Sequence, residues 1–233
     1  ALPPIIVTSL QSISQKTLTI NHFRSSCRQI KVGDTADQQQ LLDFLQKTGY
    51  RIARLVDTPG SISRRGGIID VYPTAATHPY RIEFFGSTVE SIRLFDPVSQ
   101  LSLQQIESIF IPPAEECLPS IVDKQEIENL RNQLDMDNCS EIEQLRIAND
   151  LTMAVEGYTL DEPAFYQGFF CHGSLLDFLD TETLLVLENP SDLESERIKL
   201  DEKSGELRVM KELSGVIPRQ FPSIHLTGSE LND

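Results

Sequence analysis

The sequence lacks the features that would assign it directly to several classes of protein. No apolar run approaches the roughly 18 residues of a membrane-spanning helix. The four cysteines, at positions 27, 117, 139 and 171, form no Cys-x-x-Cys pair, so zinc ligation is not indicated. The first residues lack the basic start of a signal peptide. We therefore expect a cytoplasmic protein with reduced thiols, no membrane anchor and no bound metal.

Nucleotide-binding and catalytic motifs are also missing. There is no Gly-x-x-x-x-Gly-Lys-Ser/Thr loop and no Gly-x-Gly-x-x-Gly loop. The pair Gly66-Gly67 precedes a strand-like run, whereas a phosphate-binding loop leads into a helix. The four histidines are scattered, and no serine or cysteine occupies a nucleophile elbow. These absences predict no cofactor and no catalytic residue.

The charge is distributed very unevenly along the 233 residues. Residues 1–114 contain 11 Lys and Arg against 9 Asp and Glu, whereas residues 115–233 contain 9 against 26. Such asymmetry predicts two units with different surfaces. The acidic second half would repel nucleic acid and anionic membranes.

The hydrophobic patterns predict an α+β protein. A helix is expected over 35–48, where Leu41, Leu42, Phe44 and Leu45 recur at helical spacing. Short strands separated by turns follow from Tyr50 to Pro113. Helices are expected over 120–134 and 140–157, and the charged stretch 191–207 is either an exposed helix or a mobile arm. Further strands are expected at 3–10, 183–190 and 223–227.

This order of elements suggests an insertion. We expect an antiparallel β module over about 36–114, inserted into a mixed α/β host domain built from 1–35 and 115–233. The chain starts abruptly on a strand-like run and has no initiator methionine. It is therefore expected to be a piece of a longer protein.

Arginines dominate the positive charge of the strand-rich region. Six arginines and no lysine occur between Arg51 and Arg93. Arginine favours bidentate recognition of carboxylates over diffuse attraction to phosphate. On the alternating run 80–86, Arg81, Glu83 and Phe85 should share one face, opposite Ile82 and Phe84. An exposed aromatic beside arginine is typical of a protein-interaction hot spot.

Other interpretations of these residues stay open from the pattern alone. Phe85 could cover a second small core, while the arginines merely solvate the sheet. Asp70, Glu83 and Glu90 could instead serve a metal-dependent nuclease or phosphatase, although single acids alternating with apolar residues are usual on a half-solvated sheet. Direct DNA binding is a third possibility.

A resemblance bears on this choice. The stretch from "GYRIARLVDTPGSISRRGGIIDVYP" through "YRIEFFGSTVESIRLFDPVSQ" to "IFIPPAEE" resembles the UvrB-homology module of the bacterial transcription-repair coupling factors, the Mfd family. The resemblance covers about 65 residues, from Gly49 to Glu116. UvrB shares the module but usually has Arg-Gly-Asp where this sequence has Arg65-Gly66-Gly67.

The resemblance implies a non-catalytic module that recruits the damage-recognition ATPase UvrA. In the longer parent it implies an ATP-dependent DNA translocase that also contacts RNA polymerase and DNA through regions absent here. The family's partner-facing positions correspond to Arg65, Arg81 and Phe85, with Arg51 and Arg64 as secondary candidates. Arg64 should point the other way on its strand.

This sequence departs from the family pattern in several places. Ser61-Ile62 replaces Glu-Phe, Ser87-Thr88 replaces an acidic pair, and Ser63 stands where UvrB has a second arginine. These departures concern the strength of the expected binding.

Overall fold

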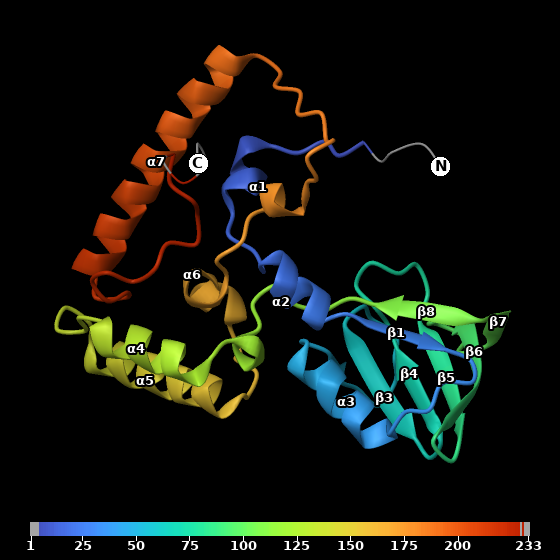
Figure 1. Ribbon diagram of the computed structural model, residues 1–233. Coiled ribbons are helices and arrows are strands. Elements are labelled where there is room, and N and C mark those ends of the chain that lie inside the picture. The colour runs from blue at the N-terminus through green and yellow to red at the C-terminus, as the bar shows by residue number, and fades with distance from the viewer. Residues whose placement is uncertain (1–4, 229, 231–233) are drawn as a thin grey trace. The chain divides into compact units, whose positions relative to one another are not determined.

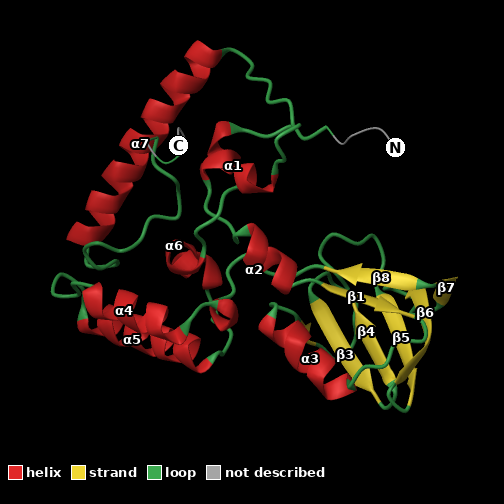
Figure 2. Cartoon of the chain, in the orientation of Figure 1, coloured by secondary structure: helices red, strands yellow, loops and turns green. Residues whose placement is uncertain are grey.

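The computed structural model describes residues 5–228 and Glu230, and the chain divides into two compact units. One unit, here called the β unit, comprises Asn21–Ile121 together with Gly157–Thr159. The other, here called the helical unit, comprises the described residues up to Ile20, Val122–Glu156 and those from Leu160 onward. Figures 1 and 2 show the strands gathered in the β unit.

The β unit contains a six-stranded sheet in the order β2-β3-β4-β5-β6-β7. All neighbours are antiparallel except the short parallel pair β2–β3. The strands are β2 (Arg51–Ile52), β3 (Ser61–Arg65), β4 (Ile68–Val71), β5 (Tyr80–Phe85), β6 (Thr88–Phe95) and β7 (Ser102–Ile106). A separate antiparallel pair is formed by β1 (Arg28–Lys31) and β8 (Ser108–Ile111).

Helix α3 (Gln38–Lys47) and the β1–β8 pair pack on one face of this sheet, as Figure 1 shows. The Asp37 side chain caps the helix by accepting a hydrogen bond from the Gln40 backbone N–H at 2.9 Å. The helical spacing of leucines brings one apolar stripe onto the sheet. The shared core consists of residues from α3, from both sheets and from the loop before β2: Ile30, Leu41, Leu42, Leu45, Tyr50, Ile62, Ile69, Val71, Ile82, Phe84, Val89, Ile92, Ile109 and Ile111.

The predicted helix of this region and the strands β4, β5, β6 and β8 are confirmed. The run 51–56 forms a strand only at Arg51–Ile52, and β1, β3 and β7 were not among the predicted strands. In β1 only Ile30 is buried among four residues, so the run is too short for a period of two to be visible. Its tertiary partner β8 supplies the hydrogen bonds that make it a strand.

The two glycines between β3 and β4 have different roles. Gly66 has φ +60°, a left-handed conformation that side chains rarely adopt. A Cβ on Gly67 would lie 2.9 Å from the backbone oxygen of Phe84 on the adjacent strand. The Phe84 backbone N–H also donates to the Gly67 oxygen at 2.8 Å. Gly67 thus allows a close approach of two backbones.

The helical unit contains α1 (Leu10–Ser14), α4 (Lys124–Gln133), α5 (Glu141–Glu156), α6 (Gln167–Phe170) and α7 (Pro190–Leu213). The short helix α2 (Ile20–Ser25) spans the boundary between the two units, and 3₁₀ turns lie at Pro119–Ile121, Pro163–Tyr166 and Leu175–Phe178. An aromatic cluster gives the helical unit its core: Phe165, Tyr166, Phe169, Phe170 and Phe221. The buried hydroxyl of Tyr166 donates to Asp150 of α5 at 2.7 Å.

The α+β class is confirmed, but the strands expected outside the β unit are wrong. Residues 5–9 and 183–189 form no strand, and their apolar side chains are exposed. Residues 1–4 of the first run lie outside the described part. Within 223–227, only a bridge between His225 and Gln15 forms. An apolar β-branched run becomes a strand only when a neighbouring strand accepts its backbone hydrogen bonds, and the described residues supply none here.

The charged stretch 191–207 lies in an exposed helix, as one of the two alternatives predicted. Helix α7 has no buried residue. Ion pairs three or four residues apart support its turns: Glu194–Arg197, Arg197–Asp201, Glu196–Lys199 and Arg208–Glu212. The four cysteines form no disulfide bond with one another. Within the described part of the chain, no helix has the length and apolar character needed to cross a membrane.

Candidate protein-interaction surface

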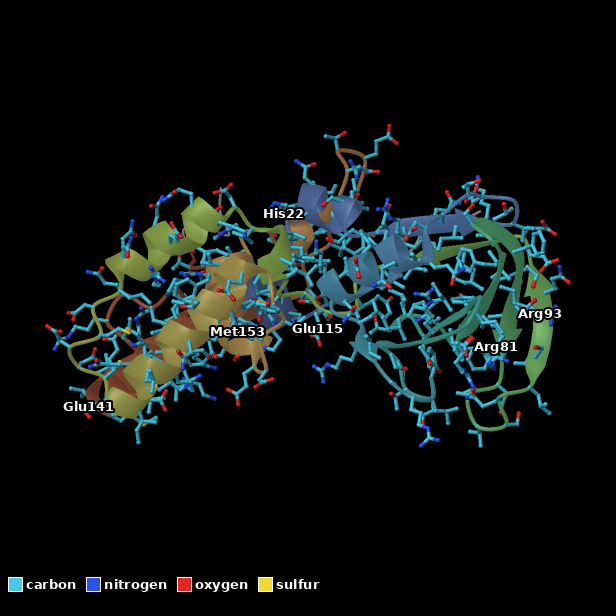
Figure 3. The ribbon with its side chains drawn as sticks, turned by 90° about the horizontal axis from the view of Figure 1, so that it is seen from below. His22, Arg81, Arg93, Glu115, Glu141 and Met153 are labelled. Carbon is cyan, nitrogen blue, oxygen red and sulfur yellow. The ribbon has the colours of Figure 1, made fainter. Side chains whose placement is uncertain are left out.

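The sheet face opposite α3 carries a row of polar side chains across five strands. Ser63 pairs with Asp70, Asp70 with Arg81, Arg81 with Arg93, and Arg93 with Gln105. Directly paired residues in antiparallel strands point to the same face. Figure 3 shows Arg81 and Arg93 on this part of the sheet. We call this side of the sheet the arginine face.

Asp70 lies at the centre of an ionic network on the arginine face. Its side chain is 1% exposed. Arg81 donates from Nε to Oδ1 at 2.8 Å and from Nη2 to Oδ2 at 2.9 Å. Arg65 donates from Nη2 to the same Oδ2 at 2.8 Å. Two guanidiniums therefore compensate one buried carboxylate, which would otherwise be costly to bury.

The Arg81 guanidinium is held by two neighbours, the Asp70 carboxylate and the Phe95 ring. Its side chain is only 18% exposed, and its Cζ lies 4.5 Å from the ring centroid of Phe95. Phe95 packs in a small second core with Val56 and Tyr72. The hydrogen bonds to Asp70 raise the pKa of Arg81 above its usual value, so its charge is permanent. Arg81 therefore has a structural role whatever else it does.

An ion pair with Glu83 compensates the charge of Arg93, the next arginine of the row. Arg93 lies opposite Arg81, and like charges in such a position are destabilising. Glu83 accepts from Arg93 Nη2 at 3.0 Å and also accepts from the Ser91 hydroxyl. Glu83 and Ser91 are themselves paired on β5 and β6. The Arg93 side chain remains 40% exposed, so it is still accessible to solvent.

Phe85 provides a large apolar side chain at the end of β5. It is 79% exposed, whereas its neighbour Phe84 is buried in the shared core. Alternation along the strand places Phe85 on the arginine face with Arg81 and Glu83, as predicted. Four residues of strand separate the Cα atoms of Arg81 and Phe85 by about 13 Å. The two side chains thus fit within one ordinary protein contact.

The remaining predicted residues lie elsewhere. Arg64 is on the opposite face from Arg65, because it pairs with core residue Ile69, and its Nη1 donates to Gln39 of α3 at 3.1 Å. Its predicted opposite direction is confirmed, and it is not part of the arginine face. Arg51 lies on the edge strand β2 and forms an exposed ion pair with Glu115 at 3.1 Å.

The sequence pattern did not reveal the role of Asp70 or the paired position of Arg93. Asp70 sits in an apolar run and resembles any single acid on a sheet. Only the pairing of β3, β4 and β5 brings Arg65 and Arg81 to its two oxygens. Such a network is suggested by one sequence signal, an acidic residue within an apolar strand with arginines a few residues away in the sequence.

The alternative metal site finds no support in these contacts. Asp70 and Glu83 each bind arginine, and Glu90 is exposed on β6. The described residues contain no group of three or more His, Cys, Asp or Glu side chains arranged to hold a metal ion.

A concave site exists in the helical unit but contains none of the predicted residues. This hollow of about 810 Å³ lies between α7 and the segment 217–227. Arg197 and Arg208, which line it, are already paired with acids of α7. The arginine face is instead part of a sheet surface, the shape expected for a protein contact.

Comparison with known proteins identifies the β unit. Residues 29–117 match the family model of the UvrB interaction domain. This part of the chain is a UvrB interaction domain. The matched range begins one residue into β1 and ends beyond β8, so it includes the two-stranded sheet as well as the main sheet.

Curated relatives extend the similarity beyond the UvrB interaction domain. The chain is 32% identical over 213 residues to the transcription-repair-coupling factor of Bacillus subtilis, which covers 87% of this chain and 18% of that protein. The corresponding factors of Myxococcus xanthus and Escherichia coli are 36% identical over 115 residues and 30% identical over 129. These alignments cover 49% and 55% of this chain, and 10% and 11% of those proteins. The chain thus spans less than a fifth of the relatives' length.

Proposed function

We propose that the UvrB interaction domain of this chain recruits UvrA in transcription-coupled repair, through a surface formed by Arg65, Arg81 and Phe85. The observation that carries this proposal is Phe85. A large aromatic side chain is 79% exposed on the same sheet face as an arginine that is 53% exposed. Exposed aromatic and arginine side chains supply most of the binding energy in protein interfaces.

The charge of the arginine face favours a protein over DNA. Asp70 and Glu83 neutralise part of its positive charge, so few unpaired charges remain to release counterions from a phosphate backbone. Arginine without lysine suits discrete, directional contacts with carboxylates. A partner with an acidic surface and a pocket for Phe85 fits this arrangement.

The three residues contribute differently. Arg65 and Phe85 can contact the partner directly, because both are well exposed. Arg81 contributes mainly by holding Asp70, since its side chain is largely buried. In the longer parent, we propose an ATP-dependent DNA translocase that binds RNA polymerase and DNA through other regions. The module itself acts as a non-catalytic adaptor.

The proposal is tested by measuring the binding of purified UvrA to the chain by isothermal titration calorimetry. Arg65→Ala and Phe85→Ala should each weaken binding at least tenfold, and the double variant should abolish it. Arg64→Ala is the matched control, because it removes the neighbouring arginine from the opposite face. Unchanged affinity in the folded double variant would refute the proposal.

A further inference from the structure

We propose that Asp70 is a positioning residue for this binding surface, holding Arg65 so that its free N–H groups meet a carboxylate of the partner. The inference rests on the proposed function and deepens it. It assigns a role in binding to a side chain that the partner cannot reach, because Asp70 is 1% exposed.

Asp70 binds its two arginines unequally. Arg81 takes both carboxylate oxygens, through Nε and Nη2, and is covered by the Phe95 ring. Arg65 takes only Oδ2, through a single Nη2 group. Arg81 thus fixes the carboxylate in the plane of its own guanidinium, and the fixed oxygen in turn orients Arg65.

Arg65 keeps unused donors after this contact. Its guanidinium has five N–H bonds, and the interaction with Asp70 uses one of the two on Nη2. Among the described residues, Asp70 is the one carboxylate recorded in an ion pair with Arg65. The second N–H of Nη2, together with the parallel N–H of either Nε or Nη1, keeps the fork geometry that binds a carboxylate with two parallel hydrogen bonds.

The charge balance of the cluster favours an acidic partner group. Two guanidiniums share one carboxylate, which leaves one excess positive charge at Arg65. Because Asp70 restrains the long Arg65 side chain before binding, less conformational entropy is lost when a partner carboxylate arrives. The geometry therefore indicates a preorganised receptor for an Asp or Glu side chain of UvrA.

A double-mutant cycle separates positioning from a purely structural role. UvrA binding is measured for the wild-type chain, Asp70→Asn, Arg65→Ala and the double variant, at a temperature where all are folded by circular dichroism. Asp70→Asn should weaken binding about tenfold in the wild-type background and less than twofold in the Arg65→Ala background. An equal fold-change in both backgrounds would overturn the inference.

A matched control accounts for lost stability. Ile69 precedes Asp70 on β4, is fully buried and faces the opposite side of the sheet. Ile69→Val should lower the melting temperature and leave the affinity of the folded chain unchanged. A tenfold loss of affinity in Ile69→Val would show that any destabilisation of β4 weakens binding, and would overturn the positioning role.

A measurement on the wild-type chain keeps the inference testable if Asp70→Asn does not fold. Nitrogen-15 spectra at low temperature report how fast each guanidinium rotates, and Arg65→Lys assigns the Arg65 signals. Arg65 and Arg81 should both rotate slowly, and Arg54, which is exposed, should rotate fast. Rotation of Arg65 as fast as that of Arg54 would refute the inference.

The outcomes for the two proposals are distinct. Failure of the wild-type chain to bind UvrA would refute the proposed function. Binding that is lost in Arg65→Ala but retained in Asp70→Asn would leave the function intact and refute only the role of Asp70.

Discussion

Arg81 and Asp70 lie directly opposite each other on β5 and β4 and share two hydrogen bonds of 2.8 and 2.9 Å. Arg81→Ala should lower the free energy of unfolding by about 3 kcal/mol, because it leaves a buried carboxylate with a single partner. Arg93→Ala is the control, since Arg93 is adjacent but much more exposed, and it should cost less than about 1 kcal/mol. Urea unfolding measures both, and equal losses would contradict the structural role of Arg81.

Charge reversal at Arg81 should be more damaging than its removal. Arg81→Glu would place a second carboxylate beside buried Asp70, and the chain should fail to fold cooperatively. The melting transition followed by circular dichroism tests this. A normal transition in Arg81→Glu would show that Asp70 can be exposed to solvent at little cost.

Phe85 should matter for binding and hardly at all for stability. Because the ring is mostly exposed, Phe85→Ala should change the free energy of unfolding by less than about 0.5 kcal/mol. Its loss should cost about 2 kcal/mol of UvrA binding if the ring fills a partner pocket. Phe110→Ala is a control of the same residue type, exposed on the separate strand β8. Equal effects of the two variants on affinity would argue against a specific site at Phe85.

Gly67 should tolerate substitution less well than Gly66. Gly66→Ala places a side chain at φ +60° in open space, which should cost about 1 kcal/mol. Gly67→Ala forces a methyl group to within 2.9 Å of the Phe84 backbone oxygen, so β3–β4 must move away from β5. We expect Gly67→Ala to lower the melting temperature further than Gly66→Ala. The reverse order would mean that the positive φ at Gly66 matters more than the close approach at Gly67.

Asp96 should contribute stability that depends on pH. Its carboxylate accepts hydrogen bonds from the backbone N–H groups of Ser99 and Val98 and from the Ser99 hydroxyl, which lower its pKa. A lowered folded-state pKa means that the stabilisation is complete above the unfolded-state pKa of about 3.9. It is then lost as the pH falls through the folded-state pKa. Asp96→Ala should therefore be less stable than wild type at pH 6, and the difference should shrink toward pH 2. A constant difference across this range would contradict the assignment.

The sequence by itself determined much of the local structure. The helix at α3, the strands β4 to β6 and the shared face of Arg81 and Phe85 follow from side-chain periodicity and from Asp37 as a cap. The opposite directions of Arg64 and Arg65 also follow from alternation along β3. Periodicity is local, so a short stretch of sequence contains all the information needed.

The tertiary structure alone decided which side chains meet across strands. Asp70 lies 5 residues from Arg65 and 11 from Arg81, and strand register converts these separations into hydrogen bonds of 2.8–2.9 Å. The same dependence on partners explains β1, which was missed, and the runs 5–9 and 183–189, which were wrongly expected to be strands. A strand depends on hydrogen bonds to a neighbouring strand, and a buried ion pair depends on where its partner lies. Neither the neighbouring strand nor the partner can be read from the local sequence.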